Sequence, residues 1–230
     1  MKTKYLLTSL ILSAGLLVAC NGGNNGGGSG SSDKANLDYS EEQAKQKTME
    51  LANNEGFEVT IHAESSSTDP EDEDTNEDFS FGYTSEIFWG KEYGAFKKVE
   101  GGVEIYQYDE ETNTYVGGVV STEIQYDDTF GVASTYLFNV YTYVGTGTFE
   151  LSNKHDITFL GRSATEYKMG YSAYGAVVSW TVVVDKDTGM TLKVAVSGSS
   201  VGGEGGAASF EVTSLKIGSQ VTLPNLVKDL

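Results

Sequence analysis

The residues of this chain that could act as nucleophiles, acids or bases are few and scattered. There is one cysteine, Cys20, and there are two histidines, His62 and His155. His155 stands beside Asp156, which could orient it as a base, but no Gly-x-Ser-x-Gly motif supplies a nucleophile. Residues 187–189 are Asp-Thr-Gly, the signature of aspartic proteases. The chain holds one copy of it, whereas hydrolysis by proton-sharing aspartates needs two such carboxyls. We therefore expect a protein that is not an enzyme.

Carboxylates are abundant, with 33 Asp and Glu side chains in 230 residues. A pair at the separation that glycoside hydrolysis needs is an open alternative, because separation in space is not visible in a sequence. Residues 69–78 hold seven of these acids, but Pro70 interrupts them and the sixth-position glycine of a calcium loop is missing. The two histidines have no paired cysteine that would give a zinc-binding spacing. We predict a solvated acidic loop, no metal and no cofactor.

Residues 17–20 read Leu-Val-Ala-Cys and end an apolar run that follows Lys2 and Lys4. The run is shorter than the roughly 20 residues that span a bilayer, which is typical of a secretory signal. The four residues resemble the lipobox of bacterial lipoproteins. This resemblance implies that residues 1–19 are a signal peptide and that Cys20 becomes a diacylglyceryl cysteine, acylated with fatty acids such as palmitate. The mature protein would be anchored to the cell membrane or outer membrane on its extracytoplasmic side.

The chain is strongly acidic, with 15 basic against 33 acidic side chains and a net charge of −18. Cleavage before Cys20 would remove two lysines and make the net charge −20. A nucleic-acid partner is excluded, because phosphate binding needs clustered Lys and Arg and the chain has one arginine, Arg162. The same charge disfavours adsorption to an anionic membrane, so the acyl chains would provide the attachment. Residues 20–38 are mostly Gly, Asn and Ser and predict a flexible tether.

Residues 39–224 are predicted to form one domain, and residues 225–230 a tail. Ser40 and Gln43 fit a capping box, so the spacing predicts a helix over residues 41–53. From Phe57 onward apolar residues recur at every second position. An antiparallel meander is predicted from strands at 57–64, 79–89, 93–99, 103–108 and 114–120. The second of these is expected to be one long strand, one face of which carries Phe79, Phe81, Tyr83, Ser85, Ile87 and Trp89.

Residues 129–144 fit two structures. Phe130, Ala133, Leu137 and Tyr141 share one helical face, with Asp127 or Asp128 as a cap, while the β-branched and aromatic residues also suit a strand. We favour a helix. The strand pattern then resumes at 157–160, 165–171, 176–184, 190–196 and 210–217, with a hairpin loop at 185–189 that ends in a glycine.

The order of these elements, with the strand–turn–strand DKDTGMTLKV at residues 185–194, resembles the Lol lipoprotein-carrier superfamily, the LolA- and LolB-like proteins. The resemblance covers residues 39–223. It implies an α+β, mainly β fold: an antiparallel half-barrel, which is an unclosed sheet packed over one or two helices, with an apolar cavity for acyl chains. The candidate lining of that cavity is made of large apolar side chains: Phe79, Phe81, Tyr83, Ile87, Trp89, Leu137, Tyr141, Val178, Trp180 and Val182.

Two functions follow from these observations. The first is a membrane-anchored lipoprotein of the cell envelope that binds lipid, or another apolar or acylated ligand, in the half-barrel cavity. The alternative is a non-catalytic surface module that binds a protein or glycan partner, in which the same aromatic side chains form an ordinary core. The volume and lining of the concave face distinguish the two.

Overall fold

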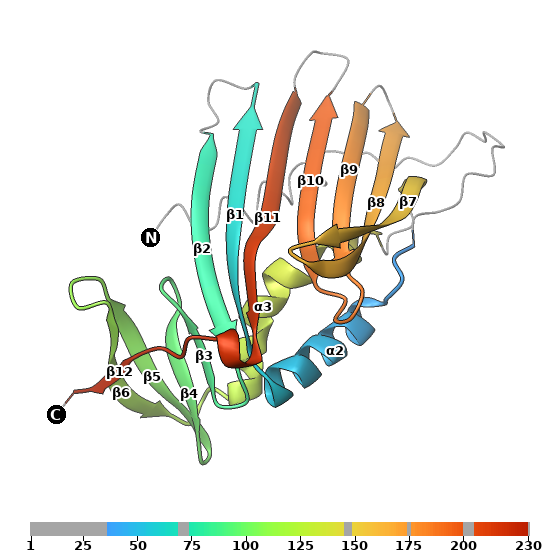
Figure 1. The fold of residues 1–230 in the computed structure, drawn as a ribbon. Coiled ribbons are helices and arrows are strands. Elements are labelled where there is room, and N and C mark those ends of the chain that lie inside the picture. Colours follow the sequence, from blue (N-terminus) through green and yellow to red (C-terminus); the bar gives the residue numbers. More distant parts are fainter. Residues whose placement is uncertain (1–35, 69–73, 145–148, 174–175, 200–204, 230) are drawn as a thin grey trace.

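The structure is a computed structural model that describes residues 36–68, 74–144, 149–173, 176–199 and 205–229 (Figure 1). Cys20, the predicted signal peptide and nearly all of the predicted tether lie outside these residues. The described part of the chain forms one twelve-stranded sheet in the order β12-β6-β5-β4-β3-β2-β1-β11-β10-β9-β8-β7. All neighbours are antiparallel except β12 and β6, which are parallel.

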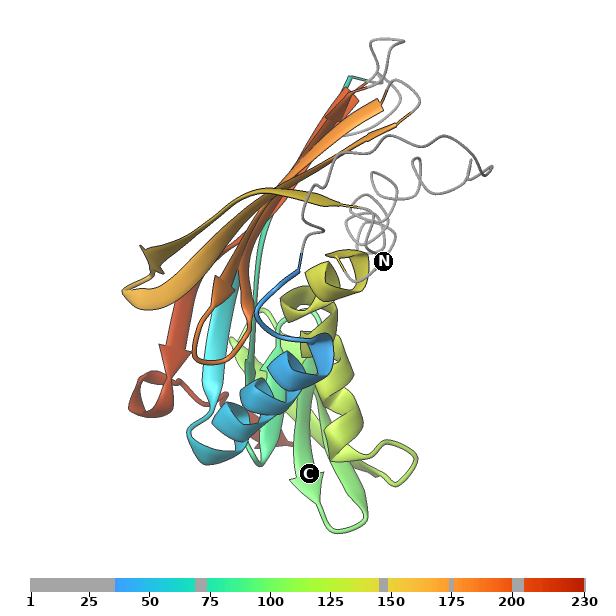
Figure 2. The ribbon, with the colours of Figure 1, turned by 90° about the vertical axis from the view of Figure 1, so that its right-hand side faces the viewer.

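The strands are β1 (Phe57–Ser67), β2 (Thr75–Tyr83), β3 (Ile87–Gly90), β4 (Gly94–Val99), β5 (Gly102–Asp109), β6 (Thr114–Ser121), β7 (Glu150–Phe159), β8 (Arg162–Ala173), β9 (Ala176–Asp185), β10 (Thr191–Ser199), β11 (Gly205–Ile217) and β12 (Leu226–Lys228). Neither edge strand pairs with the other, so the sheet is open. The helices α2 (Glu41–Asn54), α3 (Phe130–Leu137) and α4 (Asn139–Val144) all lie on one side of it (Figure 2). The predicted unclosed, mainly β sheet over a few helices is confirmed. We call its two sides the helix-covered face and the helix-free face.

Helix α2 begins and packs as its sequence predicts. The Ser40 side chain accepts a hydrogen bond from the Gln43 backbone, and the Gln43 side chain accepts one from the Ser40 backbone. Ala44, Thr48 and Ala52 are the buried face. Ala44 and Thr48 rest on the β9–β10 hairpin, where Ala44 lies against Gly189 and the Thr48 hydroxyl donates to the Thr188 carbonyl at 3.4 Å.

Residues 129–144 are helical, as we favoured, but in two pieces. Helix α3 ends at Leu137, because the backbone of the next residue, Phe138 (φ −129°), leaves the helical region, and α4 begins at Asn139. The predicted aspartate cap is wrong, because residues 126–129 form a separate 3₁₀ turn and the residue that caps α3 is Thr129, which makes no side-chain cap bond. The Asp128 side chain instead accepts from the Gln125 backbone nitrogen.

The predicted single strand over residues 79–89 is also wrong. It breaks at residues 84–86, where the Thr84 hydroxyl accepts hydrogen bonds from the Glu86 and Ile87 backbone nitrogens at 3.1 Å each. The turn changes the phase of the side chains. Tyr83 now pairs with Phe88, and Gly82 pairs with Trp89. Phe88 therefore joins the helix-covered core, whereas Ile87 and Trp89 point to the helix-free face.

Two further boundaries differ from prediction. The described part of the predicted acidic loop is largely strand, because Thr75 to Asp78 continue the β2 ladder against β1. Residues 225–230 were predicted to be a tail, yet Leu226–Lys228 form β12 on the β6 edge. We call residues 218–228 the C-terminal strap. Its Val221 and Leu226 pack on a small second core of Ile87, Trp89, Ala95, Tyr106 and Tyr115.

Candidate ligand-binding site

The structure separates the ten predicted lining residues into two groups. Ile87 and Trp89 lie in the second core on the helix-free face, as the changed phase of β3 requires. The other eight belong to the main core on the helix-covered face, seven of them buried and Phe79 half-buried. The buried ones pack against their neighbours: the rings of Phe81 and Tyr83 each lie 6.4 Å from the Phe57 ring, and the Tyr141 hydroxyl donates to the Gly189 carbonyl at 2.7 Å. Their role as a ligand lining stays a prediction.

Six rings from β2, β3, the β3–β4 turn, β4 and α3 form a continuous cluster that we call the aromatic layer: Phe79, Phe81, Phe88, Tyr93, Phe96 and Tyr136. Phe81 and Phe88 are buried, while the other four are half-buried. Tyr136 of α3 packs on β2, with its ring 4.7 Å from Phe79 and 6.1 Å from Phe81. Phe81 joins β2 to β3, with its ring 6.3 Å from Phe88. Phe88 continues the layer to Tyr93 at 5.9 Å and Phe96 at 6.0 Å. The half-barrel thus presents a graded surface, from fully buried rings to rings in partial contact with solvent.

A pair of hydroxyls gives this apolar layer one polar point. The Tyr93 hydroxyl donates to the Tyr136 hydroxyl at 2.7 Å. Burial of the phenol, with the hydrogen bond to Tyr136, raises the pKa of Tyr93 well above its usual value, so the group is neutral at physiological pH. The layer therefore combines ring surface with an uncharged hydrogen-bonding pair.

Four members of the layer escaped sequence reasoning. Phe88 was placed on the wrong face by the missed turn, and Tyr93 sits in the β3–β4 turn. Phe96 and Tyr136 lie on elements that were predicted, but their proximity to Phe79 comes only from α3 packing against the sheet. A usable signal for Phe88 was Thr84-Ser85-Glu86, a run of polar residues that favours a turn over a strand interior.

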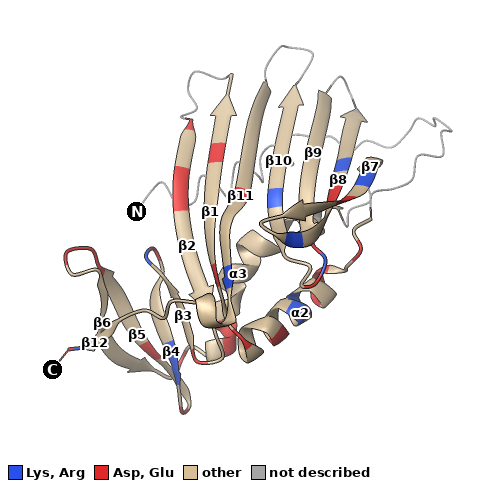
Figure 3. Cartoon of the chain, in the orientation of Figure 1, with Lys and Arg blue, Asp and Glu red and all other residues tan. Residues whose placement is uncertain are grey.

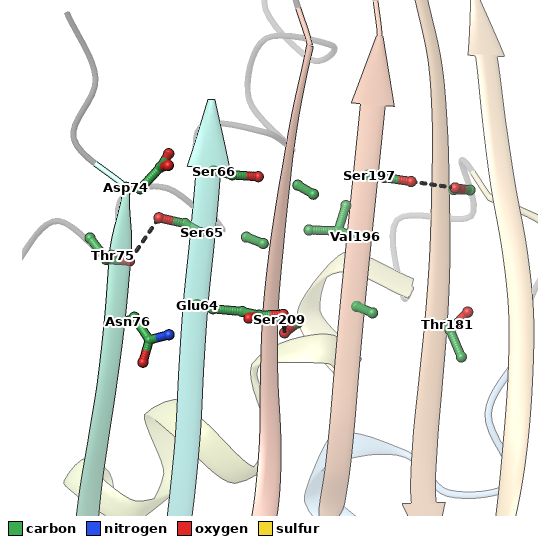
Figure 4. Close-up of a pocket in the computed structure, with 14 residues that line it drawn as sticks. Glu64, Ser65, Ser66, Asp74, Thr75, Asn76, Thr181, Val196, Ser197 and Ser209 are labelled. Carbon is green, nitrogen blue, oxygen red and sulfur yellow. Dashed lines mark hydrogen bonds between the residues drawn. The ribbon is translucent and has the colours of Figure 1, made fainter. Parts of the chain in front are cut away.

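A second feature lies on the helix-free face, across β2, β1, β11, β10 and β9. There a pocket of about 530 Å³ is lined mainly by hydroxyl, amide, carboxylate and alanine side chains (Figure 4). Of the predicted lining residues none contributes to it. Its described lining residues are Glu64, Ser65, Ser66, Asp74, Thr75, Asn76, Ser179, Thr181, Ala195, Val196, Ser197, Ala207, Ala208 and Ser209. On the pocket strands Figure 3 shows acidic bands on β1 and β2 and a basic band on β10.

The Asp-Thr-Gly triplet serves the hairpin. Asp185, just before it, is fully buried and accepts hydrogen bonds from Arg162 Nε at 2.5 Å and from the Thr188 backbone and hydroxyl, both at 2.8 Å. Burial alone would raise the pKa of the Asp185 carboxyl, but the Arg162 and Thr188 hydrogen bonds outweigh it and hold this pKa below its ordinary value. Asp187 is exposed and faces Arg162 at 3.3 Å. The Asp185 carboxylate is held ionised by its neighbours, as in a structural ion pair.

The histidines lie on strands beside carboxylates. His62 Nδ1 is 2.8 Å from Asp78, and His155 Nε2 is 3.6 Å from Glu166. Within the described ranges, no three or more His, Cys, Asp or Glu side chains gather as metal ligands would. None of the helices that the structure describes combines the length and apolar character needed to cross a bilayer.

No family model and no curated protein matches this chain. It is similar to a chain of the MucA/MucB complex of Pseudomonas aeruginosa, with 13% identity, a TM-score of 0.31 and coverage of 78% of this chain and 58% of that one. A chain from the structure of MucB in complex with MucA(peri) is 13% identical, with a TM-score of 0.32 and coverage of 79% of this chain and 57% of that one. A LolA superfamily protein from Nitrosomonas europaea is 10% identical, with a TM-score of 0.20 and coverage of 81% of this chain and 96% of that one. The chain thus spans less than two thirds of the two chains from the MucA/MucB complexes.

Proposed function

We propose that this chain is a lipid-anchored, non-catalytic protein of the bacterial cell envelope that binds an apolar or acylated ligand at the aromatic layer. The observation that carries the proposal is the layer itself: four half-buried rings continuous with two buried ones on the helix-covered face. Ligand sites are mostly apolar with a few placed polar groups, and the Tyr93–Tyr136 hydroxyl pair is such a group. An acyl chain would contact the rings while its polar end meets the hydroxyls.

The strength of such binding can be bounded. A large aromatic side chain buries about 150–250 Å² in full. Covering about 50 Å² on each of the four half-buried rings would contribute roughly 5 kcal/mol at about 25 cal/mol per Å². That free energy corresponds to dissociation constants in the range of about 0.1–1 mM, so the rest of an acyl chain must find further contacts for tighter binding.

Anchoring is supported by the lipobox-like residues 17–20. Growth of the expressing bacterium with an alkyne-bearing palmitate should label the full chain and place it in the membrane fraction. The Cys20→Ala chain should lose both the label and the membrane association. Unlabelled wild-type protein, or a Cys20→Ala chain that stays in the membrane with its label, would refute the anchor.

Ligand binding is tested by native mass spectrometry of the full acylated chain, released from cell membranes in a mild polyoxyethylene detergent. We expect a noncovalent lipid adduct in addition to the acyl groups on Cys20. The Phe79→Ser/Tyr136→Ser chain should lose at least ten-fold in adduct occupancy. Val177→Ser, at an exposed apolar side chain on β9, is the matched control and should keep it. Thermal unfolding by circular dichroism checks that all variants fold; equal occupancy in wild type and double variant, or no adduct in any, would reject the proposal.

A further inference from the structure

The pocket on the helix-free face is built mainly from the interior of the sheet. Four of its five strands, β1, β11, β10 and β9, have a hydrogen-bonded neighbour on both sides along the pocket. β2 pairs with β3 only at Phe81–Tyr83, so its pocket residues Thr75 and Asn76 have β1 beside them and form the rim of the pocket. A peptide that recognises a sheet by adding a strand would lie along this β2 edge, beside the pocket and not over it. Recognition at the centre of the pocket must therefore come from side chains.

Those side chains are of one chemical kind. Eight of the fourteen lining residues carry a hydroxyl or amide group, and hydroxyls both donate and accept hydrogen bonds. Ser65 and Thr75 bond each other on the side of the sheet that carries Ala63, so six of these groups lie on the helix-free face. There the Ser179 and Ser197 hydroxyls bond one another across β9 and β10 at 2.9 Å (Figure 4). The Ser209 hydroxyl donates to Glu64 at 3.1 Å. A ligand rich in hydroxyls would replace or extend these bonds in kind.

The lining also restricts the charge of the ligand. Glu64 and Asp74 are its ionisable members, and the fourteen described lining residues contain no Lys, Arg or His. With a net charge of −18 on the whole chain, an anionic ligand would be repelled. An apolar ligand would displace water from these polar groups and return no hydrogen bond. Carboxylates and serine hydroxyls together suit groups that donate hydrogen bonds without carrying negative charge.

The size and floor of the pocket fit a short chain of sugar rings. Its volume of about 530 Å³ lies within the range of small-molecule sites, roughly 300–1,000 Å³. Ala195 and Ala207 leave the sheet surface low at its centre, so that a flat ring can approach the strands. We propose that this pocket binds an uncharged oligosaccharide, whose hydroxyl or acetamido groups donate to Glu64 and Asp74 and exchange hydrogen bonds with the serines.

Titration calorimetry of the purified full chain tests this proposal, in a polyoxyethylene detergent that carries no sugar head group. The probes are chitotriose, which has amide N–H donors, and maltotriose, which has hydroxyls only. We expect saturable binding of at least one, with a dissociation constant below about 1 mM, as for other weak specific ligands. The Ala207→Trp chain fills the centre of the pocket and should weaken binding at least ten-fold.

Thr213→Trp is the matched control, because Thr213 is exposed on the same strand, β11, and outside the pocket lining. It should bind like wild type. No saturable binding of either trisaccharide, or equal binding by Ala207→Trp, would overturn the proposal, and so would preferential binding of tetralysine. The lipid adduct, measured in the same variants, should be unchanged, so the two proposals fail independently.

Discussion

The two faces of one sheet carry different chemistry on alternate residues of the same strands. In β1, Val59, Ile61 and Ala63 are fully buried under the helices, while His62 and Glu64 face the other way among polar groups. One face becomes an aromatic and aliphatic core, and the other a hydroxyl-lined pocket. The difference teaches that the two-residue period of a strand lets one set of residues supply stability and its neighbours supply a separate binding surface.

The helix-covered face should give the largest stability effect. Phe81 is 1% exposed and touches the rings of Phe57, Phe88 and Tyr136. Phe81→Ala should lower the free energy of unfolding by about 3–5 kcal/mol, through lost burial and a cavity. Its control is Ser80→Ala, one residue away on the other face, with a loss below about 1 kcal/mol in urea titrations. Similar losses for both would show that the faces do not divide stability in this way.

The next effect concerns the hairpin to which the helices attach, through Thr48 to Thr188 and Tyr141 to Gly189. Arg162→Met leaves the buried Asp185 carboxylate without its cation and should cost about 3 kcal/mol. Lys168→Met, on the same strand and in an exposed pair with Glu166, should cost about 1 kcal/mol or less. Equal urea midpoints for the two variants would show that the buried Arg162–Asp185 pair contributes no more to stability than the exposed Lys168–Glu166 pair.

The same carboxylate predicts a pH dependence. Because the folded protein holds the pKa of Asp185 below its ordinary value, this group stabilises the fold above the unfolded pKa of about 3.9. That contribution is lost as pH falls through the lower, folded pKa. Stability measured from pH 6 down to pH 2 should therefore fall less steeply in Asp185→Asn than in wild type. Parallel curves would show that the carboxyl is not held ionised by folding.

The second core should have no room for an added methyl group at Gly82. A Cβ atom added at Gly82 would lie 2.1 Å from the Trp89 ring, which covers that glycine. Gly82→Ala should cost about 1–3 kcal/mol through overpacking. Urea unfolding followed by tryptophan fluorescence should show this loss of stability. Gly131→Ala is the control, because a Cβ atom added there meets no atom within 4 Å. An unchanged urea midpoint for Gly82→Ala would mean that the C-terminal strap moves to make room for the added methyl group.

The smallest stability effect belongs to the pocket. Ser197→Ala removes one hydroxyl from the pair with Ser179 on the helix-free face and should change stability by no more than about 0.5 kcal/mol. Thermal melts of wild type and variant should overlay. A loss comparable to that of Phe81→Ala would make the hydroxyl ladder a structural element, and would remove the contrast between the faces.

Much of the fold was predictable because long stretches of its strands alternate. Residues 57–64, 176–182 and 192–196 obey a period of two, and the Ser40–Gln43 capping box marks α2. The prediction failed where a local hydrogen bond competes with the pattern. At Thr84 one hydroxyl engages two backbone nitrogens and reverses the facing of every side chain from Ile87 to Gly90.

The candidate sites were harder to predict for two physical reasons. The aromatic layer depends on α3 carrying Tyr136 onto β2, a contact between residues far apart in the chain. The pocket is made of outward Ser, Thr and Ala residues, which individually look like any solvated strand face. Only the sheet order, with β11 inserted between β1 and β10, brings Glu64, Ser209 and Ser197 together.

The parallel strand β12 has a consequence for association between molecules. It satisfies part of the β6 edge through the hydrogen bonds from Tyr115 to Asn225 and from Asp229 to Gly117. Just beyond this pairing, Val119 and Val120 are 71% and 55% exposed. Without β12 the whole edge would become a template for strands of other chains, the usual origin of aggregation in open sheets. We therefore expect β12 to limit association between molecules. Loss of β12 would lower the yield of unaggregated protein more than it would change the fold.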